Sequence, residues 1–522
     1  MRVKLILPAL TEAKSPFFRP IKYSLFPPLG LATLAGYLRD DDEVTLHDEH
    51  VESLDLADAA HPRSCGEGSS VDDDPDLVAI QVYITSARRA YEIADHYRAR
   101  GVHVALGGLH VTSLPQEASR HADTIFLGPG EDTWPAFLRD FRDGHPGRVY
   151  QSKERSLAGQ PRIRRDLIRR HLYLAPNSLM VSRGCPHACD FCYKESFFRG
   201  GKSFYTQTVD QALAQIERLP GRHLFFLDDN IFGDREFAMT LFDAMRGMGR
   251  IWQAAGTLQS ALDAELLGKA VESGLRSLFV GFETLSAANL RSQRKFHNLN
   301  RDYDHAVRRL HDAGVLINGS FVFGMDDDDE TVFERTVEWA IGDGIETATF
   351  HILTPYPGTA LHQRLAAEGR IISENWDLYD TRHAVYQPAK VSPQQLEDGY
   401  RRAYRDFYRW GAILRGASTK ETVSARVRHI AYAGGWKKCE PLWDLVIRAK
   451  RVCSLGGLLE AVLSGFDRDT TPEMLDHAVT LDDRNSGSER RDGDARPEAS
   501  DEELIALSTP ARRLPAGTGA RG

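Results

Sequence analysis

The sequence predicts an α/β protein with a Rossmann-like N-terminal domain, a partial (β/α)6 TIM barrel and a helical C-terminal region. Short apolar segments alternate with helical patterns over the first 150 residues, as in a doubly wound parallel sheet. Six further strand-and-helix units follow from about Ser178, fewer than a closed barrel needs. The chain has 522 residues, 42% of them hydrophobic, and single cores stop growing near about 250–300 residues, so we expect several domains.

Domain boundaries follow from shifts in these patterns. We expect the Rossmann-like domain at 1–150, a linker at 151–176, the partial barrel at 177–393 and the helical region at 394–479. Residues 480–522 predict a disordered tail, because their few apolar side chains cannot offset the entropy lost on ordering.

The N-terminal domain has five predicted strands, with a polar insertion between the second and third. The insertion, His61–Asp74, is rich in Ser, Gly and Asp, and we expect its Cys65 to be inert. The strands are Val3–Leu7, Val44–Leu46, Leu77–Gln81, Val102–Leu106 and Thr124–Leu127. A run of arginines in the linker predicts a solvated helix rather than a nucleic-acid patch: Arg162, Arg164, Arg165, Arg169 and Arg170.

The barrel has six predicted strands, and three of its helices end at a glycine that suits a left-handed C-cap. These glycines are Gly274, Gly314 and Gly344. The strands are Leu179–Val181, Leu224–Leu227, Ala254–Leu258, Leu278–Val280, Ser320–Phe323 and Ala348–Leu353. Because the chemistry of parallel barrels lies at the carboxyl ends of the strands, residues that follow each strand are site candidates.

Charge and cysteine content exclude several classes of protein. The formal net charge of −9 gives no general attraction to nucleic acid. We find no export signal and no apolar run of the roughly 18 residues that a membrane span needs, and therefore expect a cytoplasmic protein without a transmembrane segment. Six cysteines, three of them within eight positions, indicate a metal site in a reducing compartment rather than a disulfide framework.

Cys185, Cys189 and Cys192 follow the first barrel strand and form one loop at the predicted catalytic face. Structural zinc and ordinary electron-transfer clusters take four protein ligands, so three cysteines leave one metal position open for substrate. His187 is the candidate fourth ligand of a competing zinc site, but Cys439 and Cys453 are too distant and isolated to form its second half. We favour an iron-sulfur cluster over zinc.

The C-x3-C-x2-C spacing, with Phe191 before the third cysteine, resembles the radical S-adenosylmethionine (SAM) superfamily. The resemblance implies that the three cysteines bind a [4Fe-4S] cluster, whose fourth iron binds SAM, and that a flavodoxin or ferredoxin supplies the electron. It also implies SAM contacts after the successive strands. The candidates are Phe191, Asp228, Asp229, Asn230, Gln259, Ser260, Glu283 and Tyr356.

A Rossmann-like domain before such a barrel resembles the cobalamin-binding (B12-binding) members of that superfamily, over residues 1 to about 408. Loops at the carboxyl ends of the sheet are expected to hold the cofactor, and glycines there allow backbone to approach a flat macrocycle. The D-x-H-x-x-G signature of many cobalamin proteins is absent, and we interpret His50 as a polar loop residue. The candidate contacts are Thr85, Ser86, Gly107, Gly108, His110, Gly128, Gly130 and Glu131.

These resemblances predict a methyltransferase that acts on an unactivated carbon, or on phosphorus, of a small metabolite or lipid. The main alternative is non-methylating radical chemistry, such as oxidation, cyclisation or rearrangement. Transfer-RNA modification and a non-catalytic cobalamin-binding sensor are further alternatives. The sequence identifies no general acid or base for the substrate.

Overall fold

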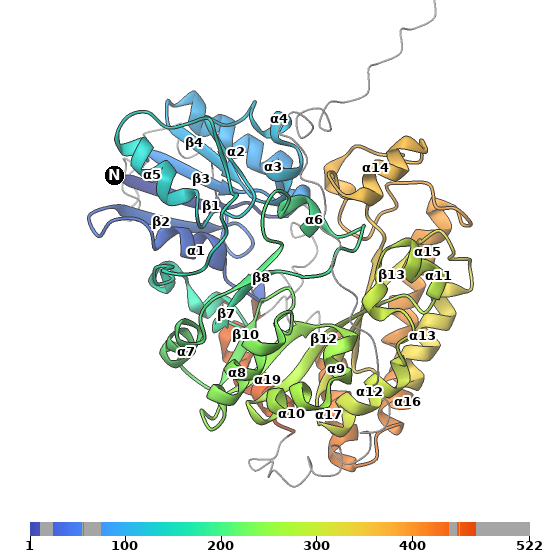
Figure 1. Ribbon diagram of the computed structural model, residues 1–522. Helices are drawn as coiled ribbons and strands as arrows, with labels where there is room; N and C mark the ends of the chain where they lie inside the picture. Colours follow the sequence, from blue (N-terminus) through green and yellow to red (C-terminus); the bar gives the residue numbers. More distant parts are fainter. Residues whose placement is uncertain are drawn as a thin grey trace, which may run out of the picture.

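The computed structural model describes residues 1–10, 24–54, 56, 75–437, 446–447, 449–450 and 452–465. It contains two six-stranded sheets and a two-stranded hairpin, followed by C-terminal helices. Figure 1 shows the first sheet (blue and cyan) beside the second (green and yellow), with the last helices in orange. The predicted fold class is confirmed. Cys65, Cys439 and the predicted tail lie outside the described residues.

The N-terminal sheet is wholly parallel and has the order β2-β1-β3-β4-β5-β6. Alternate side chains point to opposite faces, so Ile6 and Val104 enter one core while Leu5 and Ala105 enter the other. The strands are β1 (Arg2–Leu7), β2 (Glu43–Asp48), β3 (Leu77–Gln81), β4 (His103–Gly107), β5 (Thr124–Leu127) and β6 (Val149–Gln151).

Helices cover both faces of this sheet, as its near-continuous apolar strands require. The longer ones are α1 (Leu29–Ala35), α2 (Ala87–Ala99) and α5 (Trp134–Arg142); short helices η4 (Ile84–Ser86), α3 (Leu109–Ser113) and α4 (Pro115–Ala118) follow strand ends.

The second sheet is an open, parallel half-barrel of order β14-β13-β12-β11-β10-β7. Large apolar side chains such as Trp252, Phe282 and Phe350 point outward and pack under the surrounding helices. Its strands are β7 (Ser178–Leu179), β10 (His223–Phe226), β11 (Ile251–Gly256), β12 (Leu275–Glu283), β13 (Leu316–Phe323) and β14 (Thr347–Ile352).

The helices of the half-barrel pack on its outer face and at its strand ends. They are α6 (Tyr193–Phe197), α7 (Val209–Arg218), α8 (Arg235–Met245), α9 (Leu258–Leu262), α10 (Ala264–Glu272), α11 (Ala287–Ser292), α12 (Tyr303–Asp312), α13 (Val332–Gly342) and α14 (Ala360–Ala367).

The C-terminal helices are α15 (Pro393–Phe407), α16 (Trp410–Ser418), α17 (Val423–Lys437) and α19 (Gly456–Leu463). Helix α15 lies along the outer edge of β14. The hydroxyl of Tyr404 accepts from the Phe350 amide and donates to its carbonyl, and Tyr408 does the same at Ala348. The two tyrosine hydroxyls therefore pair with backbone amides and carbonyls at an edge where a seventh strand would otherwise pair.

The structure differs from the predicted elements in several places. Strand β6 and the antiparallel hairpin β8 (Ser182–Gly184) with β9 (Phe204–Thr206) were not predicted. The third barrel strand begins and ends earlier than Ala254–Leu258. The arginine run forms two short 3-10 turns, η5 (Arg165–Leu167) and η6 (Arg170–Leu172), in place of the predicted helix. Arg165 donates to the Ser178 carbonyl and Arg170 to the Asn177 side chain, so two of its arginines bond to the start of the barrel. Gly274, Gly314 and Gly344 have φ of +115°, +71° and +69°, which confirms the predicted left-handed caps.

No helix in the described part of the chain is long and apolar enough to cross a membrane.

Candidate active site

A cavity of about 610 Å³ lies between the two sheets. Its size falls within the range of roughly 300–1,000 Å³ that is typical of ligand pockets. One wall is built from loops at the carboxyl ends of the N-terminal strands, and the other from the segments around the cysteine loop. The first wall includes Asp48, His50, Gln81, Tyr83, Gly107, Gly108, Gly128, Gly130 and Glu131; the second includes Met180, Ser182, Arg183, Tyr193, Leu227 and Asp229.

Bare backbone forms much of the first wall. Gly108 has φ +116°, and a Cβ there would lie 2.8 Å from the Val82 carbonyl oxygen. Gly128 has φ +80°, and its Cβ would lie 3.3 Å from the Phe197 carbonyl oxygen. A side chain at either position is therefore both strained and obstructed. The cavity consequently has the glycine-lined surface that a broad, flat macrocycle requires.

Three predicted contacts of this domain are absent from the described cavity wall. Ser86 is buried in the turn after β3, where its hydroxyl donates to the Tyr83 carbonyl, and Thr85 is buried beside it. His110 is buried against Trp376, and its Nε2 lies 2.8 Å from Glu117 Oε1. Gly107, Gly108, Gly128, Gly130 and Glu131 do line the cavity.

His50 has a different environment from the one expected of a polar loop residue. It is buried in the turn after β2, and its Nδ1 lies 2.8 Å from Asp48 Oδ1. The Leu10 amide donates to its Nε2 at 3.3 Å. The Asp48 carboxylate also accepts from the Tyr173 hydroxyl. This network fixes the side chain of His50 at the cavity wall.

An ion pair joins the two walls. Arg183 Nε lies 2.7 Å from Glu131 Oε1, and the side chains are only 16% and 12% exposed. Arg183 stands two residues before Cys185, while Glu131 belongs to the loop after β5. Glu131 lies close to Tyr37, whose pKa is raised to about 12 by burial and by this carboxylate. The pair could not be predicted from the sequence, because its two residues are 52 positions apart.

The three cysteines lie between β8 and α6. Cys189 is buried, and Cys185 and Cys192 are half-buried. The pKa of Cys189 is raised to about 12, mainly by burial, and the nearby Cys192 and Cys185 contribute to the rise. Among the described residues, no three His, Cys, Asp or Glu side chains form a preassembled metal site. His187 stacks on His297 with ring centroids 3.8 Å apart, which gives no support to its role as a zinc ligand.

Buried cations suit the cysteine loop to a negatively charged cluster. Lys295 lowers the pKa of Cys189, and Lys194 lowers the pKa of Cys192, although burial of both thiols outweighs these effects. Three soft sulfur donors flanked by ammonium groups match the ligand chemistry of an iron-sulfur cluster. The residues therefore fit the group that the cysteine spacing implies.

Lys295 is held by Glu283 at the end of β12. Its Nζ lies 2.7 Å from Glu283 Oε1, and both side chains are nearly buried. Glu283 has φ +64° and interrupts the pairing of β12 with β13. A Cβ at Gly281 would lie 2.5 Å from Glu283 Oε1 and 3.1 Å from Lys295 Nζ. A side chain at Gly281 would therefore displace the two charged groups of this ion pair.

The three polar residues that follow β10 have different environments. Asp228 is buried, accepts from the Val181 and Ser182 amides and the Ser182 hydroxyl, and so holds the strand that leads into the cysteine loop. Burial raises the pKa of Asp228 to about 6, despite these donors. Asp229 faces the cavity, 3.1 Å from Lys194 Nζ. Asn230 is buried, and its Oδ1 has no hydrogen-bond partner among the described residues, which leaves an acceptor for an ammonium group.

The remaining predicted SAM contacts occupy varied positions. Ser260 lies in the first turn of α9, where its hydroxyl donates to the carbonyl of the N-cap residue Thr257, and Gln259 is exposed. Phe191 packs against the cluster of Val322 and Leu353 near the ends of β13 and β14. Tyr356 is half-buried in the turn after β14.

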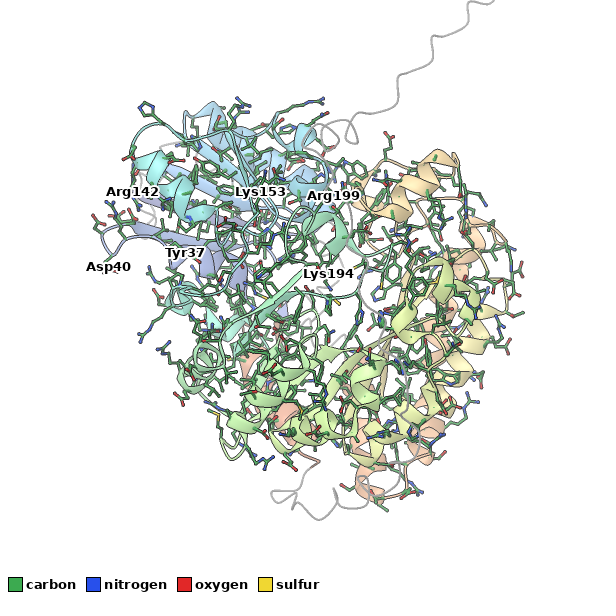
Figure 2. All side chains as sticks on the ribbon, in the orientation of Figure 1. Tyr37, Asp40, Arg142, Lys153, Lys194 and Arg199 are labelled. Carbon is green, nitrogen blue, oxygen red and sulfur yellow. The ribbon has the colours of Figure 1, made fainter. Side chains whose placement is uncertain are left out.

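Sequence reasoning missed the residues that connect the cavity to the cysteine loop. Tyr193 and Lys194 follow Cys192 directly, and both lie beside Asp229. Across the cavity, Gln81 donates to the Tyr83 hydroxyl at 2.9 Å. Figure 2 shows Lys194 near the centre of the molecule, where the N-terminal domain and the half-barrel meet. Tyr193 and Lys194 could have been found from the sequence, because they follow the third cysteine directly.

Two family models match the chain. Residues 23–138 match the B12 binding domain, and residues 179–340 match the Radical SAM superfamily.

Bacteriochlorophyllide d C-12(1)-methyltransferase of Chlorobaculum tepidum is 32% identical over 354 residues, which cover 65% of this chain and 76% of the relative. Bacteriochlorophyllide d C-8(2)-methyltransferase of the same organism is 27% identical over 66% of this chain and 80% of the relative. The solved structure of the radical SAM methyltransferase TsrM from Kitasatospora setae, with cobalamin and a [4Fe-4S] cluster bound, has a TM-score of 0.58 at 14% identity, over 91% of this chain and 98% of that one. This last likeness concerns the fold.

Proposed function

The chain belongs to the B12-binding radical SAM enzymes, and from that membership we propose that it transfers a methyl group to an unactivated carbon of a small or lipid-like metabolite. Family membership implies a [4Fe-4S] cluster, SAM and cobalamin as cofactors. The two relatives described above are methyltransferases by name, which favours methyl transfer over the other radical reactions.

One observation carries the proposal. The cavity of about 610 Å³ is shared between the glycine loops of the N-terminal sheet and the segments on either side of the cysteine loop. A cofactor in the first domain would therefore face a cofactor on the half-barrel without an intervening layer of protein. Methyl transfer needs this proximity, because reacting groups must be held at near contact.

We assign the cluster to Cys185, Cys189 and Cys192. The backbone at Gly107, Gly108, Gly128 and Gly130 would contact cobalamin. When bound, these cofactors together supply hydrogen-atom abstraction and the methyl group.

The SAM site would use Asn230 and Asp229 as acceptors, together with Glu283. Lys295 and Lys194 would balance the charge of the thiolates, and Asp228 would position the strand that bears them. The pair of Glu131 and Arg183 would hold the two walls together and keep water out of the cavity.

The physiological setting is also part of the proposal. A flavodoxin or ferredoxin would reduce the cluster, and the enzyme would work in the cytoplasm, where thiols stay reduced. The cofactors themselves supply the reactive groups, so the assignment of a general acid or base is not required for this reaction.

The test is anaerobic reconstitution of the full chain with iron, sulfide and hydroxocobalamin, followed by absorbance spectra. SAM is then added with dithionite, and 5′-deoxyadenosine and S-adenosylhomocysteine are measured. The comparison is a triple variant, Cys185→Ala/Cys189→Ala/Cys192→Ala, and the matched control is Cys453→Ala, which changes an exposed cysteine far along the sequence.

We expect cluster and corrinoid absorbance and both SAM products from the wild type and from the control, and corrinoid absorbance alone from the triple variant. Formation of 5′-deoxyadenosine without S-adenosylhomocysteine, even with candidate substrates present, would contradict methyl transfer. Iron binding by the triple variant at the wild-type level would contradict the ligand assignment.

A further inference from the structure

The segment between β12 and α12, residues 284–301, forms an exposed basic surface beside the cysteine loop. It has four basic side chains and no acidic one. Lys295 is buried, and the other three, Arg291, Arg294 and Arg301, are exposed. Phe296 lies among them in the short helix η7 (Phe296–Asn298) and is 61% exposed. We call Arg291, Arg294, Phe296 and Arg301 the basic patch.

The backbone of the basic patch is fixed on the half-barrel. The side chain of Asn298 is buried and donates to the carbonyls of Gly281 and Phe282 near the end of β12. The Arg294 amide donates to the Arg291 carbonyl. Arg294 has φ +53°, a left-handed conformation that is strained for any residue but glycine and persists only where the surroundings impose it. The patch is therefore preformed, which lowers the entropy cost of binding a partner.

The same segment lies directly against the cysteine loop. The ring of His297 stacks on the ring of His187, which belongs to that loop, with centroids 3.8 Å apart. The Asp190 amide, also in the loop, donates to the Gln293 carbonyl at 3.2 Å. A protein bound at the patch would therefore be separated from the cysteines by this one segment of chain. Because electron transfer slows steeply with distance, the position suits an electron donor to the cluster.

The charges of the basic patch have no ionic partner in the described part of the chain. None of its three arginines forms an ion pair there, although Arg301 Nε reaches a backbone carbonyl at 3.4 Å. The carboxylates nearest in sequence are engaged elsewhere, since Glu283 pairs with Lys295 and Asp302 caps α12. The chain as a whole has a formal net charge of −9. An acidic partner, which this net charge repels, would thus be steered to the basic patch.

The composition of the patch favours a protein partner over a membrane or a nucleic acid. Arginine and aromatic side chains are enriched at protein interfaces, where lysine is depleted. Anionic membranes are bound by larger groups of about four to eight basic residues. The net charge of −9 opposes binding to a phosphate backbone.

We propose that the basic patch is the docking surface for the protein that reduces the cluster, and that this partner is a small, acidic one-electron carrier. In the complex one electron passes from the reduced carrier to the cysteine-bound cluster. The carrier is oxidised by one electron, the cluster is reduced by one, and no bond forms or breaks. The inference rests on the proposed function for the presence of the cluster, and it extends that function by assigning a surface to the electron donor.

The test has three measurements on the full chain. Binding of oxidised flavodoxin is measured by surface plasmon resonance. Reduction of the reconstituted chain by flavodoxin hydroquinone is followed by stopped flow through the absorbance of the flavodoxin semiquinone. SAM cleavage with dithionite, a small reductant that needs no docking surface, is measured on the same samples.

Two variants of the patch are compared with a matched control. They are Arg291→Glu/Arg301→Glu and Phe296→Ala. The control, Arg139→Glu/Arg218→Glu, changes the net charge by the same amount. Like Arg291, both of its arginines are exposed and lie in the last turn of a helix. Their helices, α5 and α7, lie on the left of Figure 1, whereas α11 lies on the right.

We expect the control to match the wild type. In Arg291→Glu/Arg301→Glu at low ionic strength, the affinity for flavodoxin and the rate constant of reduction should each fall about tenfold or more, within the range of electrostatic steering. The difference should shrink at about 1 M salt, where the Debye length is about 3 Å. Phe296→Ala should lower the affinity about fivefold at either salt concentration. Dithionite-driven SAM cleavage should be the same in all of these proteins.

Equal flavodoxin affinity and reduction rate in Arg291→Glu/Arg301→Glu and in the control would overturn the proposal. Failure of the wild type to bind both flavodoxin and an acidic ferredoxin would also overturn it. In either case, binding of phosphatidylserine vesicles by the wild type but not by Arg291→Glu/Arg301→Glu would assign the patch to a membrane surface. Absence of iron or of dithionite-driven SAM cleavage in the wild type contradicts the proposed function, whereas intact cleavage with equal flavodoxin kinetics contradicts the docking surface alone.

Discussion

Glu131→Gln removes the charge from the ion pair that joins the two walls of the cofactor cavity. Arg183 Nε lies 2.7 Å from Glu131 Oε1, with side chains 16% and 12% exposed. Unit charges about 4 Å apart attract by about 4 kcal/mol at an effective dielectric constant of about 20. Breaking a buried pair costs about 3–5 kcal/mol. The substituted amide still accepts a hydrogen bond, so we expect a loss of about 2–3 kcal/mol, which is about 30- to 150-fold in an equilibrium constant.

Hydrogen exchange measured by mass spectrometry is the suitable assay, because a chain of several domains does not unfold in one step. Amides of β8 and of the loop 128–132 exchange when the two walls separate locally. We expect their exchange in Glu131→Gln to be faster by about 30- to 150-fold, in line with the lost interaction free energy.

The matched control is Glu92→Gln in the same domain. Glu92 is 55% exposed and lies 3.3 Å from Arg89 Nη1, and exposed pairs contribute about 0–1 kcal/mol. If the two variants exchange equally at β8 and at the loop, the pair of Glu131 and Arg183 does not hold the walls together, and the reasoning above is refuted.

Three further predictions follow from buried polar groups. The guanidinium of Arg155 donates to four backbone carbonyls, so Arg155→Lys should lower the melting temperature through a loss of about 2–4 kcal/mol; an unchanged melting temperature would contradict this. Gly281→Ala should reduce iron content after reconstitution, whereas Gly268→Ala, with no neighbouring atom within 4 Å, should retain it; equal iron content would be the contrary result. Glu346 Oε1 lies 2.6 Å from Lys420 Nζ. The pKa of Glu346 is held well below its usual value, because neighbouring histidines and Lys420 outweigh the effect of burial. Its stabilising effect is thus present above about pH 4.5 and lost as pH falls below, so Glu346→Gln should lower stability by about 3–5 kcal/mol at neutral pH and by progressively less in acid; a penalty that does not depend on pH would refute the assignment.

Elements with strong apolar patterns could be predicted from the sequence, and weakly patterned ones could not. The strands of both sheets were predicted from runs such as Leu77–Gln81, which a parallel sheet buries on both faces. Strand β6 has three residues at a partly exposed sheet edge, so it carries no such run. Strand β8 contains Ser182 and Arg183, and its position depends on the carboxylate of Asp228, 46 residues away in sequence.

The candidate site shows the same division. Loop glycines and the cysteine triplet are local patterns, and the sequence indicated them. The ion pairs of Arg183 with Glu131 and of Lys295 with Glu283 depend on tertiary contacts, so residue type alone did not reveal them. His50 is intermediate: the nearby Asp48 was visible in the sequence, but its burial at a cavity wall follows from the packing of β2 beside β1.

The two tyrosines along β14 have a consequence for how the half-barrel can change in evolution. A strand would tie that edge by a ladder of backbone bonds whose register permits only whole-residue steps. Tyr404 of α15 and Tyr408 at its C-cap tie the edge by side chains, at two points. Leu396, Ala403 and Phe407 of the same helix are buried in the core of the half-barrel, so packing fixes the helix as well. Substitutions within this one helix can therefore reshape the edge of the half-barrel without changing the backbone ladder between β13 and β14.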